Sequence, residues 1–434
     1  APGHGGWPGS PSATDARCQH RLVRLLHLTP ELPYAPGGSG GSTRQFHLLR
    51  ELVGRGHDVT VVAPIAPGQA SGALLLKAAG VRLVEFERPH SRVRESLRAL
   101  AAAPGLVPRA ALEPVTAWQV GVFWASLRPL ALREIAAWQP DLVSVEHDMA
   151  AAWVGDLPPG TPAVITCHNV SGDYYASRAR ASSGAARIGL RAEATRYRRH
   201  DSRWLGRYRR IVAMSDADAA ELSAMAPGTP VDVVPNGVAT ADIGPAAGPP
   251  PEPATLVFTG TMAYPPNREA ALWFAARVWP RVVERRPDAR LLVVGRDPTD
   301  DVRALAAADE RIEVTGGVPL VMPYYERAGV VVAPVRSGGG TRLKVLEALA
   351  SARPLVSTSV GCEGIDVTPG EHLLVEDDPQ RFADAVVALI EDPARARALG
   401  EAGRERAVER YDWSALGGLL EAVYERAGEA STRS

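Results

Sequence analysis

The sequence predicts an α/β protein built from two Rossmann-like, doubly wound domains that face each other across a cleft. From residue 22 onward, short apolar runs alternate with stretches of helical periodicity, and this alternation is typical of a parallel sheet covered by helices. A segment rich in proline and glycine, 244–253, interrupts the alternation, as a linker would. The same alternation then resumes, so the chain contains this architecture twice.

The bulk composition narrows the class of protein. The chain has 434 residues, with 48 Lys and Arg against 49 Asp and Glu, and a net charge near zero argues against a general nucleic-acid binder. Cys18, Cys167 and Cys362 are widely spaced and predict neither a disulfide framework nor a zinc site, which favours a reducing, cytoplasmic compartment. No apolar run reaches the length of a transmembrane helix. Residues 1–20, rich in Gly, Pro and Ser, predict a disordered tail.

The first domain is expected over residues 21–243. A glycine-rich loop, 36–42, follows its first strand, and Phe46, Leu49 and Leu52 then recur at helical spacing. The predicted strands of this domain are 22–28, 58–64, 81–86, 141–147, 163–169, 211–215 and 231–237.

The second domain is expected over residues 254–410. A helix at 267–280 follows its first strand, and helices dominate from residue 379 onward. The predicted strands of this domain are 255–260, 289–295, 311–316, 329–334 and 354–359. Ligands of such sheets bind beyond the carboxyl ends of the strands, so two domains that face each other predict a deep ligand cleft.

The stretch RSGGGTRLKVLEALA, 336–350, runs from three glycines into a helix with Thr341 as its expected N-cap and leucines as its buried stripe. Arg342 and Lys344 lie in the first turn, where the helix dipole is already positive. An anion held by the free N–H groups would explain both cations. The alternative is two solvated cations, with Lys344 pairing with Glu347 one turn later.

Neither common nucleotide fingerprint fits this chain. The P-loop requires G-K-[ST], but Thr-Arg-Leu-Lys follows the last glycine. The dinucleotide pattern G-x-G-x-x-G fails at both glycine runs, because Leu343 and Thr43 stand where the third glycine is needed. ATP and NAD sites are therefore not predicted.

These pieces together resemble the family 4 retaining glycosyltransferases, which have the GT-B fold. The likeness covers residues 22 to 427 and rests on PGGSGGSTRQFHLLRELVGRGHDVTVV at 36–62, PNGV at 235–238, FTGTMAYPPN at 258–267, VVG at 293–295, GGGTRLKVLEALASARPLVSTSVGCEG at 338–364 and YDWSALGGLLEAVYERA at 411–427. The pieces occur in the family's order, and that order makes the resemblance specific.

The resemblance implies transfer of a hexose-type sugar from a nucleotide diphosphate-sugar to an acceptor, with retained anomeric configuration and no required cofactor or metal. The implied donor-binding residues are Gly40, Gly41, Gly260, Gly338, Gly339, Gly340, Thr341 and Glu347, and the implied catalytic residues are His147, Arg342 and Lys344. The glycines would hold the diphosphate, the two cations would neutralise it, and Glu347 would accept hydrogen bonds from the ribose hydroxyls. A C-terminal segment, 411–434, would carry a helix back to the first domain.

One departure from the family pattern concerns the E-x7-E pair of glutamates. Eight residues before Glu347 stands Gly339, so the first glutamate, which contacts the donor sugar in relatives, is absent. Relatives with a similar GGGTRLK loop lack it as well, which favours a subfamily feature over an inactive enzyme.

Several polar residues keep two interpretations. His147, at the end of a predicted strand, is either the family's active-site histidine or a satisfied core histidine. His168 and Asn169, at the end of the next strand, contact the acceptor or only cap a turn. Asn267 either caps its helix or faces the donor.

Two charged segments are also ambiguous. Asp216 to Asp218 fits a metal-binding D-x-D, but Ser215 with Asp218 has the spacing of a helix cap, which we favour. The segment Arg178 to Arg210 carries eleven arginines and two acids. It is either a solvated helical face or a surface for anionic lipid or a polyanionic acceptor, which would place the protein at the inner face of the membrane.

Three other functions remain as alternatives on the same fold. A sugar-nucleotide epimerase would need the donor alone, and a non-catalytic partner protein would bind the nucleotide sugar without turning it over. A glycan phosphorylase is disfavoured, because no lysine stands in a recognisable pyridoxal-binding context. The sequence does not specify whether the acceptor is a small molecule, a glycan or a lipid-linked acceptor, nor does it specify the oligomeric state.

Overall fold

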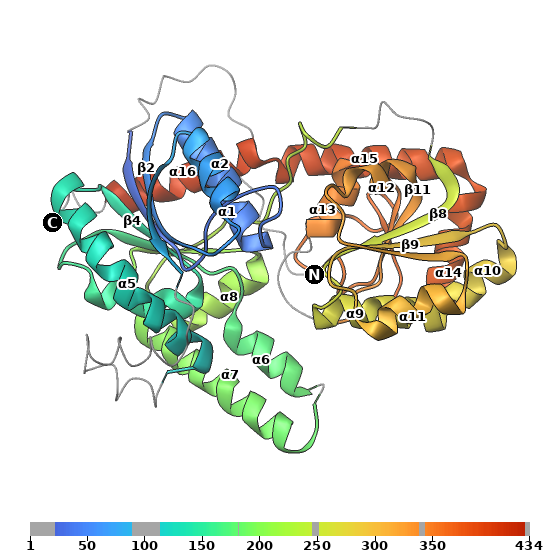
Figure 1. Cartoon of the computed structure of the whole chain (residues 1–434), viewed down its shortest axis with the longest axis horizontal. Helices are drawn as coiled ribbons and strands as arrows, with labels where there is room; N and C mark the ends of the chain where they lie inside the picture. The colour runs from blue at the N-terminus through green and yellow to red at the C-terminus, as the bar shows by residue number, and fades with distance from the viewer. Residues whose placement is uncertain (1–21, 89–112, 181, 245–250, 338–342, 430–434) are drawn as a thin grey trace.

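The computed structural model describes residues 22–88, 113–180, 182–244, 251–337 and 343–429. The predictions made for the tail 1–20, for Gly338 to Gly340, and for Thr341 and Arg342 lie outside these ranges. Two parallel sheets with helices on their faces lie side by side (Figure 1). The predicted α/β class with two Rossmann-like domains is therefore confirmed.

The first sheet has seven parallel strands in the order β3-β2-β1-β4-β5-β6-β7. They are β1 Arg24–Leu28, β2 Asp58–Ile65, β3 Arg82–Glu87, β4 Leu142–Glu146, β5 Ala163–Thr166, β6 Arg210–Ala213 and β7 Val231–Val233. The chain builds outward from β1 in one direction and then returns to build outward from β4. The crevice beyond the carboxyl ends of β1 and β4 is therefore the expected ligand position.

Helices cover both faces of this sheet. They are α1 Gly40–Gly54, α2 Ala70–Ala78, α5 Val115–Trp138, the 3₁₀ segment η1 Asp148–Asp156, α6 Ser171–Arg180, α7 Gly184–Trp204, the short η2 Leu205–Arg207 and α8 Asp216–Met225. The predicted glycine loop is shorter than expected, because Ser39 caps α1 by accepting from the backbone N–H of Ser42 at 3.0 Å. Gly40 and Gly41 therefore form the first turn of α1.

The second sheet has six parallel strands in the order β10-β9-β8-β11-β12-β13. They are β8 Glu252–Thr259, β9 Arg290–Val294, β10 Ile312–Gly316, β11 Ala328–Ala333, β12 Leu355–Ser357 and β13 Leu374–Val375. The helices around it are α9 Pro265–Trp273, the π-helical turn η3 Phe274–Val278, α10 Trp279–Arg285, α11 Asp300–Ala308, α12 Met322–Arg327, α13 Leu343–Ala350, α14 Pro379–Glu391 and α15 Pro393–Tyr411.

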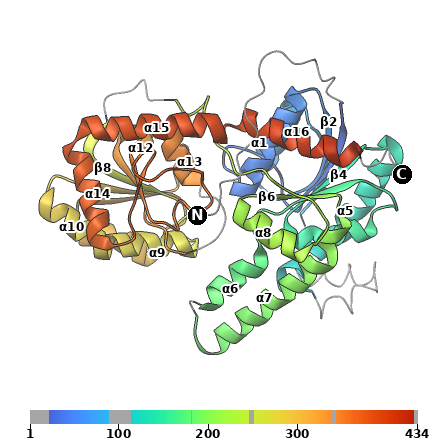
Figure 2. The same cartoon turned by 180° about the vertical axis from the view of Figure 1, so that it is seen from behind.

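The last helix, α16 Trp413–Glu429, lies against α1 in the first domain, as Figure 2 shows from behind. Its Tyr424 hydroxyl forms a hydrogen bond with Ser144 Oγ on β4 at 3.1 Å, and Glu421 lies 2.9 Å from His57 Nε2. Where the chain crosses between domains, Val238 N donates to Tyr411 O at 2.8 Å. No helix in the described part of the chain is long and apolar enough to cross a membrane.

Candidate functional site

The carboxyl ends of β4 and β5 bring His147 and His168 together. The two imidazole rings are stacked, with centroids 4.1 Å apart and planes inclined by 21°. His147 also has a φ of 72°, a backbone conformation that side-chain-bearing residues rarely adopt and that is enriched at functional sites. Neighbouring strands of a parallel sheet end at the same edge, so the sequence positions after β4 and β5 converge here.

Glu31, in the loop after β1, joins this histidine pair to the start of α1. Its Oε1 lies 3.1 Å from His147 Nε2, and its Oε2 accepts from the hydroxyl of Ser39, the N-cap of α1, at 2.7 Å. Gly41 packs directly on the group. A Cβ at that position would lie 2.6 Å from Glu31 Oε1 and 3.2 Å from His168 Nδ1.

Electrostatics assign different protonation states to the two histidines. Burial opposes charge on His147, but the hydrogen bond and charge of Glu31 outweigh it and raise the pKa of His147. Burial also opposes ionisation of Glu31, yet His147 lowers the pKa of that carboxyl to about 2. Burial and the neighbouring His147 charge hold the pKa of His168 well below its usual value. His147 therefore binds a proton more readily than His168 does.

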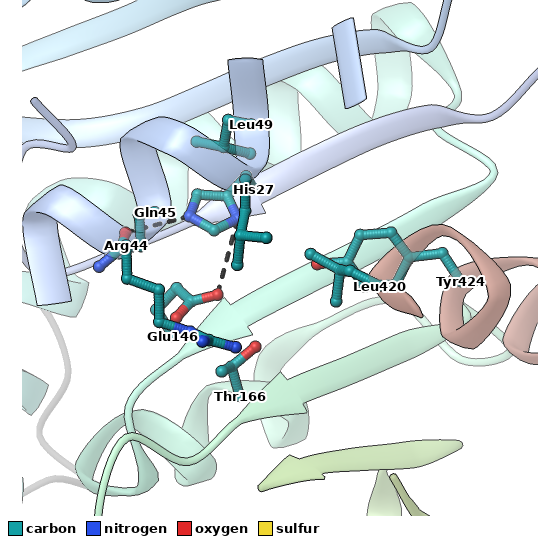
Figure 3. Close-up of a pocket in the computed structure, with 9 residues that line it drawn as sticks. His27, Arg44, Gln45, Leu49, Glu146, Thr166, Leu420 and Tyr424 are labelled. Carbon is teal, nitrogen blue, oxygen red and sulfur yellow. Dashed lines mark hydrogen bonds and ion pairs between the residues drawn. The ribbon is translucent and has the colours of Figure 1, made fainter. Parts of the chain in front are cut away.

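A buried polar layer of the first sheet and α1, which includes His27, Gln45 and Glu146 (Figure 3), adjoins His168. Glu146 Oε2 lies 2.5 Å from His168 Nε2, and its Oε1 lies 3.9 Å from His27 Nδ1. Gln45 Oε1 lies 3.1 Å from His27 Nε2. Burial raises the pKa of Glu146 and lowers that of His27. Both pKa shifts favour the neutral forms of these two groups, and the contact of Glu146 with His168 Nε2 fixes the orientation of the His168 ring.

The chain after β5 continues directly from this edge into α6. Asn169 is exposed, next to the buried His168. Asp148 Oδ2 accepts from the N–H of Ser171, the first residue of α6, at 2.9 Å. The two predicted acceptor residues therefore lie at the root of the α6–α7 helical pair.

The second domain places Lys344 at the carboxyl end of β8. Its Nζ donates to Asn267 Oδ1 at 2.6 Å and lies 4.4 Å from the centre of the Phe258 ring. A Cβ on Gly260 would approach Asn267 Nδ2 to 2.6 Å and Lys344 Nζ to 2.9 Å. Gly260 also has a φ of 155°, a conformation that side-chain-bearing residues rarely adopt, so glycine is favoured beside this ammonium group.

For Asn267, the structure rules out one of the two interpretations that the sequence left open. The N-cap of α9 is Tyr264, and the Asn267 amide instead donates to Thr261 O at 3.0 Å while its carbonyl accepts from Lys344. The cap interpretation is wrong because Pro265 and Pro266 begin the helix before Asn267.

Glu347 lies one turn after Lys344 on α13. Its Oε2 accepts from the Tyr325 hydroxyl at 3.1 Å, and the same hydroxyl lies 2.8 Å from Thr259 Oγ1. Burial raises the pKa of Glu347, while Tyr325 and the charge of Lys344 lower it in part. Tyr325 and Thr259 therefore hold the carboxylate in one orientation at the carboxyl edge of the sheet.

The two half-sites approach each other where α1 and α13 begin. A Cβ on Gly40 would lie 3.4 Å from Leu343 Cδ1. Leu343 was expected in the buried stripe of its helix, but it is only partly buried and faces the other domain, whereas Leu346 and Leu349 are fully buried. The first turns of two helices, one from each domain, therefore meet beside Lys344 and Gly41.

Arg336 and Ser337, which follow β11, contact α9. Ser337 Oγ donates to Glu269 Oε2 at 2.9 Å, and the Arg336 guanidinium lies over the Trp273 ring at 5.1 Å. Lys344, which follows residues 338–342 in the sequence, also contacts α9, through Asn267. The described residues on both sides of 338–342 in the sequence therefore contact α9.

Several site residues were missed by the sequence interpretation: Glu31, Gln45, Glu146, Thr259 and Tyr325. Glu146 could have been noticed, because a carboxylate at the end of an apolar run, just before a histidine, predicts a buried polar group with a partner. Glu31 gave no signal of its role, since its partner His147 lies 116 positions away in the sequence.

The D-x-D segment forms a helix cap. Ser215 Oγ accepts from the N–H of Asp218 at 3.2 Å, so the capping prediction is confirmed. Within the described residues, no group of three or more His, Cys, Asp or Glu side chains has an arrangement that could hold a metal ion.

Comparisons with known proteins agree with this geometry. Residues 38–242 match the model described as "Glycosyltransferase Family 4", and residues 253–392 match the model described as "Glycosyl transferases group 1". The chain is 30% identical over 208 residues to a phosphatidyl-myo-inositol mannosyltransferase of Mycobacterium leprae, covering 46% of this chain and 54% of that one. The matches span between about a third and about half of the length of the first curated relatives.

Solved structures resemble the whole chain. Sucrose-phosphate synthase of Thermosynechococcus elongatus superimposes with a TM-score of 0.67 at 18% identity, over 94% of this chain and 100% of that one. An Anabaena protein in complex with UDP-glucose superimposes with a TM-score of 0.61 at 12% identity, over 93% and 100% of the two chains. At these identities the likeness establishes the GT-B fold.

Proposed function

Starting from a chain whose first half matches the family 4 model, whose second half matches the group 1 model and which has the GT-B fold, we propose that it transfers a sugar from a nucleotide diphosphate-sugar to an acceptor with retention of anomeric configuration. One observation carries the proposal. Lys344 of the second domain lies beside the place where two helix starts meet, and the paired His147 and Glu31 lie behind Gly41 on the opposite side. The close approach of Gly40 to Leu343 supports a binding site that draws on both domains.

The donor diphosphate would bind between the two domains. The first turns of α1 and α13 present backbone N–H groups, which attract phosphate oxygens, and Gly40 and Gly41 allow close approach of the backbone. Lys344 supplies a positive charge that Asn267 holds in place. Charge grows on the diphosphate as the glycosidic bond breaks, so these groups stabilise the transition state more than the bound substrate. Arg342 would add a second charge, and the glycines 338–340 with Thr341 would add further N–H donors.

Glu347 would bind the nucleoside. The Tyr325 hydroxyl donates to one lone pair of Glu347 Oε2. The remaining lone pairs of the carboxylate can accept hydrogen bonds from the two vicinal ribose hydroxyls. This assignment needs an ionised carboxylate; burial raises the pKa of Glu347, and the Tyr325 hydrogen bond and the Lys344 charge offset part of that effect.

His147 would act next to the transferred sugar. As an imidazolium it donates from Nε2 to Glu31, and its Nδ1–H is then a second donor for a sugar hydroxyl or a phosphate oxygen. His168 and Asn169, at the adjoining strand end, would face the acceptor. With Gly339 in place of the family's first glutamate, the charged His147 is the group we propose as a replacement contact to the donor sugar.

The experiment that tests the function has two stages. Thermal unfolding with UDP-, GDP- and dTDP-sugars identifies the donor, because a bound ligand stabilises the folded state by mass action. The panel should begin with GDP-mannose and UDP-glucose, which appear in the names of similar proteins. Release of nucleoside diphosphate is then measured with and without acceptors, including phosphatidylinositol-type lipids.

The outcomes separate the alternatives. Release of nucleoside diphosphate that depends on an acceptor supports the transferase. Retention predicts an α-configured product from an α-configured donor. Conversion of the donor without any acceptor would instead identify an epimerase. Tight nucleotide binding without turnover across the panel would identify a non-catalytic sugar-nucleotide-binding partner.

A further inference from the structure

The helical pair α6–α7 projects from the first domain as a hairpin, away from both sheets, in both views (Figures 1 and 2). We call residues 171–204 the basic hairpin. Its two helices pack along each other, and α7 also packs on η1 next to the sheet. The hairpin begins three residues after His168, so its root is the candidate acceptor edge.

The basic hairpin carries eight arginines against three carboxylates. Seven of these arginines are exposed: Arg178, Arg180, Arg187, Arg191, Arg198, Arg199 and Arg203. The three acidic side chains of the hairpin neutralise few of these exposed arginines. Asp173 pairs with Arg198, Asp201 is fully buried with a pKa that burial holds well above the usual range, and Glu193 accepts from the N–H of Val115. The whole chain has a net charge of about −1, so the excess of positive charge is a local feature of the hairpin.

An apolar side chain stands among these charges near the tip. Ile188 is 72% exposed, the most exposed of the large apolar side chains in the described part of the chain. It lies between Arg187 and Arg191 near the start of α7. A soluble polyanion would engage the arginines and leave Ile188 in water. A lipid surface satisfies both features, since headgroup phosphates pair with guanidinium groups and the apolar side chain enters the acyl boundary.

We propose that the basic hairpin docks this protein on an anionic lipid bilayer. Because α6 starts just after the strand end that carries His168 and Asn169 and runs from there to the tip, a docked hairpin tethers the acceptor edge of the first domain near the membrane rather than on it. The docking itself stands on charge and exposure, whereas its use in presenting a lipid-linked acceptor rests on the proposed function.

The test compares two charge-reversed variants of the full chain in co-sedimentation with vesicles. One variant is Arg187→Glu with Arg191→Glu in the hairpin. The matched control is Arg395→Glu with Arg397→Glu, which reverses two exposed arginines of α15 in the second domain. Vesicles of phosphatidylcholine alone and of phosphatidylcholine with phosphatidylglycerol serve as the probes, each at several sodium chloride concentrations.

We expect wild-type protein and the control to bind only the anionic vesicles, with binding that weakens as salt screens the charges. The hairpin variant should bind roughly thirty-fold more weakly or worse, as about one basic side chain's contribution is lost at each site. Unchanged binding of the hairpin variant, an equal loss in the control, or no binding of wild-type protein to anionic vesicles overturns the proposal. Thermal unfolding that matches wild type excludes misfolding of these surface variants.

Two further measurements separate a bilayer from a soluble polyanion as the partner of the hairpin. Ile188→Ser should weaken binding to anionic vesicles and leave binding to inorganic polyphosphate unchanged. Equal vesicle binding by that variant, or tight polyphosphate binding with no vesicle binding, would instead identify a polyanion surface. Nucleotide affinity, measured by calorimetry, should be the same in all variants. A failure of the glycosyltransferase proposal would appear in that assay and in turnover, independently of vesicle binding.

Discussion

Replacing Glu31 with glutamine tests whether the carboxylate keeps His147 charged. The substitution preserves shape and an acceptor oxygen for His147 Nε2, which lies 3.1 Å from Oε1 in the wild-type protein. It removes the negative charge that opposes the imidazolium. The hydroxyl of Ser39 can still form a hydrogen bond with the amide, so the start of α1 should persist.

The size of the effect follows from the shifted pKa. His147 and the other partners lower the pKa of Glu31 from 4.5 to about 2, although burial acts against this. At about 1.36 kcal/mol per pKa unit, this corresponds to about 3 kcal/mol of coupling. The Glu31 side chain is 27% exposed, and solvent screens part of the interaction. We therefore expect Glu31→Gln to cost about 1–3 kcal/mol of unfolding free energy.

The pH dependence has a definite sign. The lowered pKa of Glu31 stabilises the folded state above pH 4.5, and this contribution disappears as the pH falls toward 2. The raised pKa of His147 stabilises it below pH 6.5, and this contribution disappears as the pH rises through the folded-state value. The wild-type advantage over the variant should thus be largest between pH 4.5 and 6.5.

Two assays check this prediction. Urea unfolding at pH 5.5 and pH 9 measures the stability difference, with Glu401→Gln on the exposed surface of α15 as the control. The pH profile of donor turnover measures the alkaline limb, which should move to lower pH by about one unit or more when Glu31 no longer stabilises the imidazolium. A variant with the wild-type alkaline limb and an equal stability difference at both pH values would refute the ion pair.

Three further substitutions test the rest of the site. Lys344→Ala should lower kcat/KM by the equivalent of about 2–4 kcal/mol, the scale of one preorganised charge contact, and wild-type turnover would exclude the diphosphate role. Glu347→Ala should weaken nucleotide affinity in calorimetry, and an unchanged affinity would contradict ribose binding. Gly41→Ala should reduce turnover more than tenfold, because its Cβ would lie 2.6 Å from Glu31 Oε1. Gly54→Ala at the end of the same helix, where a Cβ meets nothing within 4 Å, should keep full turnover, and an equal loss there would indicate a general effect on α1.

The strands were the most predictable part of the fold. Strands of a covered parallel sheet are buried on both faces, so β2, β4, β9 and β11 stand out as apolar runs. The helix starts were less predictable. The glycines at 40 and 41 suggested a loop, whereas the Ser39 hydroxyl caps a helix that includes them, because a local hydrogen bond outweighs the weak helix propensity of glycine.

The candidate site was predictable only where its chemistry is local in sequence. Lys344 and Glu347 lie one turn apart on a single helix, and a family pattern marks them. Glu31 meets His147 across 116 positions of the chain, and such a pairing follows from strand order, which no local pattern contains. The same holds for Asn267 and Lys344, 77 positions apart. Leu343 was placed in the core because periodicity cannot distinguish a buried face from one that meets another domain.

The position of α16 has a consequence for how the protein can be divided. Leu416 and Leu420 belong to the same apolar core as Leu25 and Leu49 of the first sheet and α1. The first domain is therefore assembled from both ends of the chain, and a fragment that stops before the second domain would expose that core to water. A deletion series from the C-terminus would destabilise the domain that is synthesised first. During synthesis, the domain that carries His147 and His168 would reach its final packing only after the second domain has been made.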